Sequence, residues 1–314
     1  MTQKTLDIVT SAYNEEQCVL ELFGRIEKVM SLHSNYEWRL IFCDNCSTDK
    51  TWELIQKIAL ESQRVLGIRM SRTFSLDAAL TMGIDNATAD AVVLMASDLQ
   101  DPPEVISDFI REFEAGYDQV VARITKREHS PYMLRILSGT FYWLVGKLTS
   151  GLLPRDVSDF RLISRKVYVA VRGLQERHRF LRGLIAWTGF NTATIEIERP
   201  QRYAGESKFR AVRLGKILRW AITHIFAHSS VPLFFLSSFG FFLSIFSLLI
   251  TAACAIFWFA SGVPFAGFGT LVGVILVGFS LTMLAIGVCA HYIALIYDEV
   301  KGRPHYIVSH RTDE

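Results

Sequence analysis

The sequence predicts an α/β protein with a doubly wound, mostly parallel sheet, followed by a basic amphipathic helix and a hairpin of two long apolar helices. Short apolar runs alternate with segments of helical hydrophobic spacing, which is the pattern of a parallel sheet covered by helices. Several of these runs end in polar side chains. Residues 220–297 contain no Asp, Glu, Lys or Arg, which separates an apolar region from the sheet domain.

The strands and helices of the sheet domain follow from hydrophobic periodicity. The expected strands are residues 6–12, 38–43, 65–70, 91–95 and 119–122. The expected helices follow Glu16, run through Trp52 and Ile55, and span residues 75–86 and 104–114.

The stretch after the fourth expected strand carries the strongest chemical signal. The apolar run Val92–Met95 ends in Asp98, Gln100 and Asp101, and Pro102-Pro103 then lead into a helix. In open α/β sheets ligands collect at the carboxyl ends of the strands, and hard oxygen groups there suit a divalent cation bridging a diphosphate. We expect Asn14, Glu15, Asp44, Arg72 and Asp98 to line this edge.

Composition bounds the class of protein. The chain has 314 residues and a net charge of +2, which argues against a nucleic-acid binder. The opening MTQKTLDIVT lacks the long apolar stretch of a cleavable signal peptide, so we expect a cytosolic catalytic part. An odd number of cysteines, five, favours reduced thiols over a disulfide framework.

The second half of the chain predicts membrane association. Seven basic residues and one acid lie between Arg199 and Arg219, interleaved with apolar residues, as in a helix on an anionic membrane face. Residues 231–260 and 267–297 are each long enough to span a bilayer. Lys and Arg residues lie before the first span and after the second, but none lies in the segment that connects the spans. The positive-inside rule therefore places both outer flanks in the cytosol.

The expected organisation has four parts. Residues 1–200 form the cytosolic catalytic domain, 201–228 the juxtamembrane basic segment, 229–298 the two transmembrane helices and 299–314 a cytosolic tail.

Several motifs together resemble one family. Tyr13–Glu16 (YNEE), Asp44–Thr51 (DNCSTDKT) and Ala96–Glu104 (ASDLQDPPE) resemble the motifs of family-2 inverting glycosyltransferases of the GT-A fold. Further resemblance lies in residues 71–80, 155–165, 202–209 and 299–308. The order and spread of these motifs is similar to membrane-bound polyprenyl-phosphate glycosyltransferases such as dolichol-phosphate mannose synthase.

The sequence departs from this pattern at four positions. Ala96 replaces the first Asp of a D-x-D motif, and Asn45 and Cys46 replace an Asp and a Gly. Ser11 replaces a proline. Loss of the carboxylate at position 96 weakens any metal site, because each hard oxygen ligand compensates charge.

The resemblance implies roles for particular residues. Asp44 would contact the nucleotide base, with Tyr13, Asn14 and Glu15 beside the nucleoside. Asp98 and Gln100 would hold Mg²⁺ or Mn²⁺ and so act in catalysis.

Two further carboxylates and a set of cations complete the expected site. Asp156 and Asp159 are the candidates for a base or a sugar-orienting carboxylate, and Asp159 is favoured slightly because it directly precedes Phe160-Arg161. By resemblance, the contacts to an anionic acceptor are Arg123, Arg135, Ser138, Arg202 and Lys208.

The expected function is transfer of a sugar from a UDP- or GDP-linked donor to a polyprenyl phosphate, with inversion, by a multi-pass protein of the inner (plasma) membrane. Glycines in the spans permit close helix packing and hence a homo-oligomer. Two alternatives stay open. One is a synthase with a sugar hydroxyl acceptor, although the sequence has no Q-x-x-R-W motif. The other is a non-catalytic membrane scaffold of the same fold that lost a metal ligand at Ala96.

Overall fold

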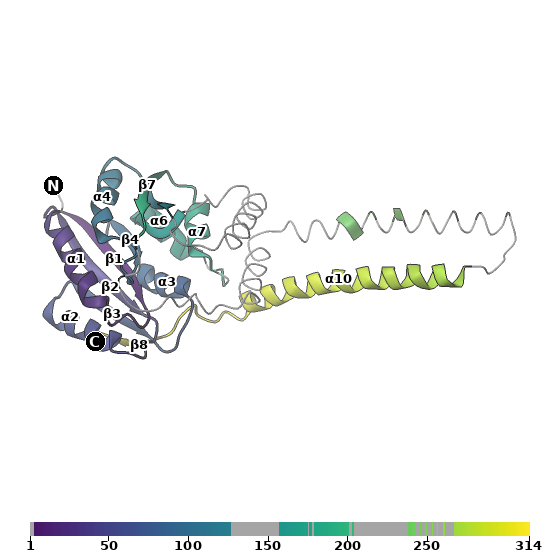
Figure 1. Cartoon of the computed structure of the whole chain (residues 1–314), viewed down its shortest axis with the longest axis horizontal. Coiled ribbons are helices and arrows are strands. Elements are labelled where there is room, and N and C mark those ends of the chain that lie inside the picture. The colour runs from purple at the N-terminus through teal and green to yellow at the C-terminus, as the bar shows by residue number, and fades with distance from the viewer. Residues whose placement is uncertain are drawn as a thin grey trace. The chain divides into compact units, whose positions relative to one another are not determined.

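The computed structural model describes residues 3–126, residues 157–200 apart from 175 and 178, residue 203, scattered positions between 238 and 260, and residues 267–314. The chain divides into two compact units. Residues 1–212 and 303–314 form the first unit, and residues 213–302 form the second. The first unit contains an eight-stranded sheet, and the second contains the long helix α10 (Figure 1).

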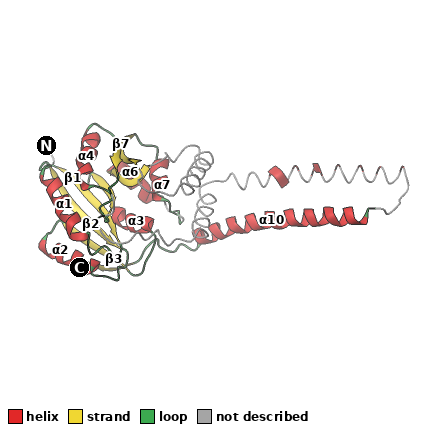
Figure 2. Cartoon of the chain, in the orientation of Figure 1, coloured by secondary structure: helices red, strands yellow, loops and turns green. Residues whose placement is uncertain are grey.

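The helices and strands of the first unit alternate along most of its length (Figure 2). In chain order they are β1 (Lys4–Ala12), α1 (Val19–Ser31), β2 (Tyr36–Asp44), α2 (Thr51–Glu61), β3 (Val65–Met70), α3 (Leu76–Asn86), β4 (Ala91–Ala96), the 3₁₀ turn η1 (Pro103–Val105), α4 (Ile106–Glu114), β5 (Gln119–Lys126), β6 (Val157–Ser164), α6 (Arg165–Gly173), α7 (Leu181–Trp187), β7 (Thr192–Glu198) and β8 (Val308–Arg311).

The strands lie in the order β7-β5-β6-β4-β1-β2-β3-β8. The four central strands β4, β1, β2 and β3 are parallel to one another, and β7 is parallel to β5. The register places Ser11 of β1 beside Cys43 of β2 and beside Ala96 of β4. The carboxyl ends of these three strands are therefore level, and the loops that follow them meet at one edge.

Two apolar cores hold the sheet, one on each face. One core joins the sheet to α1, α2 and α4 through residues such as Leu22, Ile55 and Phe109, which is packed edge-on against Phe160 at 4.7 Å between ring centroids. The other core joins it to α3, α6 and α7 through residues such as Met82 and Tyr168. Helices therefore cover both faces, as the doubly wound prediction requires.

The five predicted strands are all present, and their parallel central group is confirmed. The sheet is nevertheless mixed, because β6 runs antiparallel to β4 and β5, and β8 runs antiparallel to β3. The sequence prediction missed β6, β7 and β8. The helix expected from Glu104 begins as the turn η1 and becomes α-helical at Ile106.

The described part of the second unit is dominated by α10 (Phe268–Val300). Within the described residues one helical segment, Val277–Val300, is long and apolar enough to cross a membrane. Its 24 residues rise about 36 Å, which exceeds the hydrocarbon thickness of about 30 Å. The predicted basic helix (201–228) and most of the predicted first span (231–260) lie outside the described residues.

Two glycines in helices provide a matched test of this packing. A Cβ added at Gly83 of α3 would lie 2.1 Å from Val9 Cγ1, whereas one added at Gly24 of α1 meets nothing within 4 Å. We expect Gly83→Ala to destabilise the protein by about 1–3 kcal/mol through overpacking. Gly24→Ala should stabilise it by about 0.5–1 kcal/mol through helix propensity.

Thermal unfolding of the full chain in detergent measures both changes. A melting temperature that rises for Gly83→Ala as it does for Gly24→Ala would contradict the close packing of α3 on β1.

Candidate active site

The loops after β1, β2 and β4 each contain a residue in a strained backbone conformation. Among the described residues, the non-glycine residues with positive φ are Asn14 (52°), Cys46 (61°) and Leu99 (60°). Each follows the end of its strand by two or three residues. Residues with a Cβ rarely adopt left-handed backbone conformations, and the ones that do are frequent at functional sites. Among the described residues, the non-glycine positions with positive φ thus all lie at the edge expected from the sequence to bind a ligand.

Asp44 at the end of β2 is the centre of a buried polar network. Its side chain is fully buried and accepts hydrogen bonds from the amide and the hydroxyl of Ser47. Arg69 of β3 places its Nε 3.4 Å from Asp44 Oδ2 and donates to the Ser47 carbonyl at 2.9 Å. Burial raises the pKa of Asp44, and the Ser47 hydrogen bonds and the Arg69 charge oppose that shift.

The β1 loop is bonded to the β2 loop by hydrogen bonds in both directions. Asn14 N–H donates to Ser47 Oγ at 3.0 Å, and Thr48 N–H donates to Asn14 Oδ1 at 2.8 Å. Glu15 N–H donates to Thr51 Oγ1 at 2.8 Å. These bonds orient the two predicted nucleotide-binding segments as one body.

The structure explains one departure from the family motif, at Asn45, and shows that another, at Cys46, occupies a position suited to glycine. Asn45 donates its side-chain amide to the Phe74 carbonyl at 2.9 Å and accepts from Phe74 N–H at 2.7 Å. An ionised carboxylate could not make both bonds, because it has no donor. Cys46 occupies a left-handed position, which explains why the motif has glycine there.

The β4 loop presents Asp98 and Gln100 at the same edge. Both side chains are half-buried, and Asp98 Oδ1 accepts from the backbone N–H of Gln100 at 3.1 Å. No other described residue makes a hydrogen bond or ion pair with either side chain. The loop is anchored to β1, since Ser97 Oγ donates to the Ser11 carbonyl at 2.8 Å. Carboxylate and amide oxygens are therefore available to a ligand.

Asp101 closes this loop, a role that the sequence did not reveal. It is 2% exposed, accepts from Ala96 N–H at 3.1 Å and lies 3.3 Å from Arg199, which follows β7. Burial raises the pKa of Asp101 to about 6, with Arg199 acting in the opposite direction. The sequence placed Asp101 in this loop with Asp98 and Gln100, but it did not reveal the partner of Asp101, because Arg199 lies 98 residues away along the chain.

Asp159 of β6 is held by Arg182 of α7. The two form a double hydrogen bond of 2.9 and 2.6 Å. Burial raises the pKa of Asp159, but the charge and hydrogen bonds of Arg182 outweigh burial and hold that pKa below its usual range. The antiparallel pairing of β4 with β6 ends at Leu94 and Arg161, and Asp159 lies two residues before Arg161 on β6.

Further charges surround this pair. Arg161 is 2% exposed, and burial lowers its pKa to about 10. Asp77, near the start of α3, accepts from Leu181 N–H at 3.1 Å, and burial raises its pKa to about 6. Asp159 is therefore an ionised, oriented carboxylate rather than a strong base.

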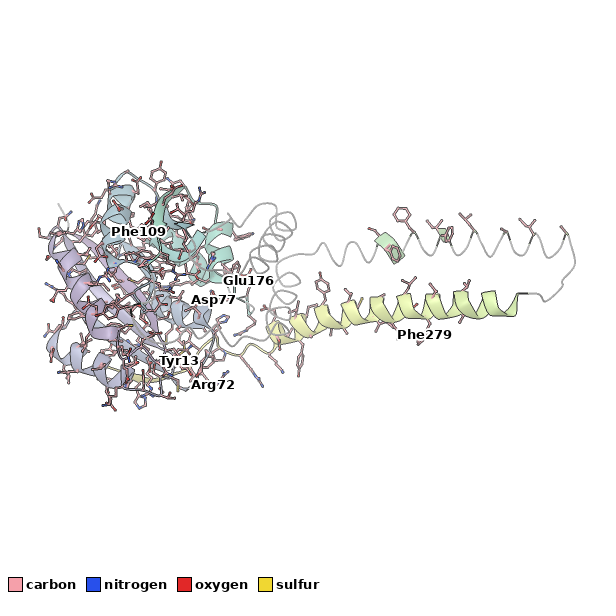
Figure 3. All side chains as sticks on the ribbon, viewed as in Figure 1. Tyr13, Arg72, Asp77, Phe109, Glu176 and Phe279 are labelled. Carbon is pink, nitrogen blue, oxygen red and sulfur yellow. The ribbon has the colours of Figure 1, made fainter. Side chains whose placement is uncertain are left out.

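The register of β1, β2 and β4 places the loops that carry the predicted donor and metal residues at one edge of the sheet. Tyr13, Arg72 and Asp77 lie on the same side of the sheet unit (Figure 3). Arg123 lies on β5 with an exposed side chain, paired in register with Val157 and Glu196. The predicted residues outside the described part of the chain are Arg135, Ser138, Asp156, Arg202 and Lys208.

Comparison with known proteins identifies the family. The family model described as glycosyl transferase family 2 matches residues 7–171, which contain the β1, β2 and β4 loops. This chain belongs to glycosyl transferase family 2. It is thus a glycosyltransferase, and the predicted resemblance is confirmed.

Several relatives are similar to this chain over nearly their full length. An uncharacterised glycosyltransferase of Bacillus subtilis, YkcC, is 35% identical over 96% of this chain and 92% of its own. The prophage-derived bactoprenol glucosyl transferase of Shigella flexneri is 33% identical over 98% of each chain. A crystal structure of glucosyl-3-phosphoglycerate synthase from Mycobacterium tuberculosis superposes with a TM-score of 0.47 at 20% identity, covering 71% of this chain and 78% of that one.

Substitutions at Cys46 test the strain in the β2 loop of this glycosyltransferase. Cys46→Gly and Cys46→Ala both remove the thiol, but only glycine adopts the left-handed conformation freely. We expect the glycine variant to be about 1–2 kcal/mol more stable than the alanine variant, measured by thermal unfolding. Equal melting temperatures of the two variants would show that position 46 is unstrained.

Proposed function

We propose that this glycosyltransferase moves one sugar from a nucleotide sugar to a polyprenyl phosphate, with inversion at the anomeric carbon. The observation that carries the proposal is the full-length similarity to relatives named bactoprenol glucosyl transferases. The strained polar edge of the sheet supports the donor half of the proposal. The apolar segment 277–300 supports a lipid acceptor.

The nucleoside would lie against the joined β1 and β2 loops. The guanidinium of Arg69 is partly exposed here and can donate to acceptor groups of a base edge, while the fully buried Asp44 carboxylate holds it in place. Tyr13, Asn14 and Glu15 belong to the loop beside it. The hydrogen bonds between the loops fix these groups before the donor arrives, which reduces the ordering that binding requires.

Asp98 and Gln100 would hold Mg²⁺ or Mn²⁺. Within the described residues no three His, Cys, Asp or Glu side chains form a metal cluster. Two oxygen ligands nevertheless fit a Mg²⁺ ion that is completed by diphosphate oxygens and waters, which is common for this cation. When bound, the ion neutralises the leaving diphosphate. Ala96 leaves this chain one carboxylate short of the family motif.

Asp159 would orient the sugar or the incoming acceptor. Because its pKa is held low by Arg182, it supplies a fixed negative charge beside the anomeric centre rather than removing a proton. A phosphate acceptor is already anionic and needs orientation more than a base. Asp156, the other candidate carboxylate, lies outside the described residues.

Basic side chains of this protein would bind the acceptor phosphate. Arg123 is exposed on β5 and free to reach a ligand in solution or at a membrane face. Arg135, Ser138, Arg202 and Lys208 complete the proposed set through the family resemblance. Arginine suits this task because its guanidinium binds phosphate oxygens in pairs.

We further propose that the second unit is a transmembrane hairpin of residues 231–260 and 267–297, with the catalytic domain and tail in the cytosol. The basic flanks and the uncharged connection between the spans support this orientation. Lys301 Nζ lies 4.1 Å from the ring centroid of Tyr297, and both tyrosine and basic residues are frequent where a membrane helix reaches the interface. Glycines in the spans allow a homo-oligomer.

Lipid-extractable label tests the reaction directly. Membranes containing the protein are incubated with radiolabelled UDP-glucose, undecaprenyl phosphate and Mg²⁺, and we expect label in the organic phase. Asp98→Ala should abolish it, since Asp98 is the proposed metal carboxylate, while membrane insertion is unchanged. Asp108→Ala on α4, which removes a surface pair with Arg111, is the control with full activity. Full turnover by Asp98→Ala at saturating Mn²⁺ would contradict the metal role.

A second donor distinguishes the remaining alternatives. GDP-mannose tested in parallel reports the base and the sugar. Label in a water-soluble polymer would favour the synthase with a hydroxyl acceptor. Absence of donor binding and of transfer with every nucleotide sugar would favour the non-catalytic scaffold.

Restoring the missing carboxylate should strengthen the metal site. We expect Ala96→Asp to lower the Mn²⁺ concentration for half-maximal activity about tenfold, because it adds an anionic oxygen ligand beside Asp98. Ala96→Asn has the same size without the charge and serves as the matched control. If both variants require the same Mn²⁺ concentration as the wild type, position 96 is remote from the metal.

A further inference from the structure

The final strand of the chain lies at the edge of the sheet next to β3. We propose that β8, here called the tail strand, positions Arg69 and through it Asp44, so that donor binding depends on the last residues of the chain. This inference rests on the proposed function in taking Asp44 as part of the nucleotide site. It assigns positioning roles to Ser309 and His310, which neither the motifs nor the family similarity single out.

Hydrogen bonds hold the tail strand and its flanking residues against β3. Thr312 N–H donates to the Gly67 carbonyl at 3.0 Å, and Gly67 N–H donates to Thr312 Oγ1 at 2.9 Å. At the other end, Ser71 N–H donates to the Ile307 carbonyl at 2.9 Å. A Cβ at Gly67 would lie 2.6 Å from Ile55 Cγ2 and 2.9 Å from Thr312 Cγ2. Glycine at this position therefore permits the close approach.

The pairing contains a β-bulge beside Arg69. Arg69 pairs with His310, but Met70 pairs with Val308, so Ser309 is an extra residue on the tail strand. Ser309 Oγ lies 3.2 Å from the carbonyl oxygens of both Arg69 and Met70, to which it can donate. Bulges increase the local twist and change the direction of neighbouring side chains, and they are frequent beside active sites. The tail strand thus shapes the backbone from which Arg69 extends.

Aromatic contacts connect the tail strand to the Arg69 side chain. The His310 ring lies 6.4 Å from the Trp52 ring, and the Arg69 guanidinium carbon lies 5.8 Å from the centroid of Trp52. Trp52 is 5% exposed, so it is fixed in the core. A cation held over an indole face is confined in position. Removing the His310 ring would loosen one side of this arrangement.

The Arg69 side chain contacts the β2 loop directly, so its position affects that loop. Its Nη2 donates to the Ser47 carbonyl and its Nε faces Asp44. Asp44 orients Ser47, whose hydroxyl also accepts from Asn14 N–H. A small displacement of Arg69 would therefore alter both loops that are proposed to bind the nucleoside. The β4 loop, with Asp98 and Gln100, has its own attachment through Ser97 and Asp101.

The test compares donor and acceptor dependence in the full chain. Ser309→Ala and His310→Ala should each raise the dissociation constant of UDP-glucose, measured by calorimetry with Mg²⁺, about three- to tenfold. The KM for undecaprenyl phosphate should stay within twofold of the wild-type value. Asp108→Asn on α4, which alters a surface pair with Arg111 away from the tail strand, is the control with unchanged donor affinity. Ser309→Ala removes only a hydroxyl, so its donor affinity can be measured even if the His310→Ala variant does not fold.

A double-mutant cycle separates positioning from general stability. In an Arg69→Ala background, His310→Ala should produce little further loss of donor affinity, because its effect passes through Arg69. Unchanged donor affinity in folded Ser309→Ala and His310→Ala would overturn the inference, and so would independent losses from His310→Ala and Arg69→Ala. The two proposals fail differently: a wild-type protein that binds UDP-glucose but transfers no sugar to lipid contradicts the proposed function alone.

Discussion

The candidate active site depends on the ion pair between Asp44 and Arg69. A carboxylate with no exposed side-chain surface is unfavourable unless a cation and hydrogen-bond donors compensate for its charge. Arg69 and Ser47 supply both, and the same contacts determine the path of the β2 loop. Because Ser47 also accepts from Asn14 N–H, the loop after β1 is determined too. Register then brings the β4 loop to the same level. One buried charge thereby organises the half of the site proposed to bind the nucleoside.

The other half of the site contains two separate ion pairs and one carboxylate without a cationic partner among the described residues. Asp101 is paired with Arg199, and Asp159 with Arg182, so each of these carboxylates has a guanidinium partner. Asp98 differs, since among the described residues its side chain accepts only from the backbone N–H of Gln100. This contrast makes Asp98 the available carboxylate at the edge. It also explains how a chain with Ala96 can still bind a metal ion, because Asp98 is not engaged in an internal ion pair among the described residues.

The sequence alone predicted the parallel centre of the sheet, because β1 to β4 are apolar runs separated by amphipathic helices, and it located Asp44 and Asp98 at strand ends. It could not predict β6 or β8. Strand β6 interrupts its apolar residues with Asp159 and Arg161, and β8 is the short polar run VSHR at a sheet edge. The pairs Asp101–Arg199 and Asp159–Arg182 were equally hidden, because their partners come from distant elements and no local pattern joins them. Only the fold brings them together.

The most direct test of the account is a structure of the full chain bound to UDP-glucose and Mn²⁺. We expect the base beside Asp44, the nucleoside along the Asn14–Glu15 loop, and the diphosphate with its metal against Asp98 and Gln100. Arg69 should keep its contacts with Asp44 and Ser47 in that complex. A nucleotide bound away from the ends of β1 and β2, or a diphosphate out of reach of Asp98, would contradict the account.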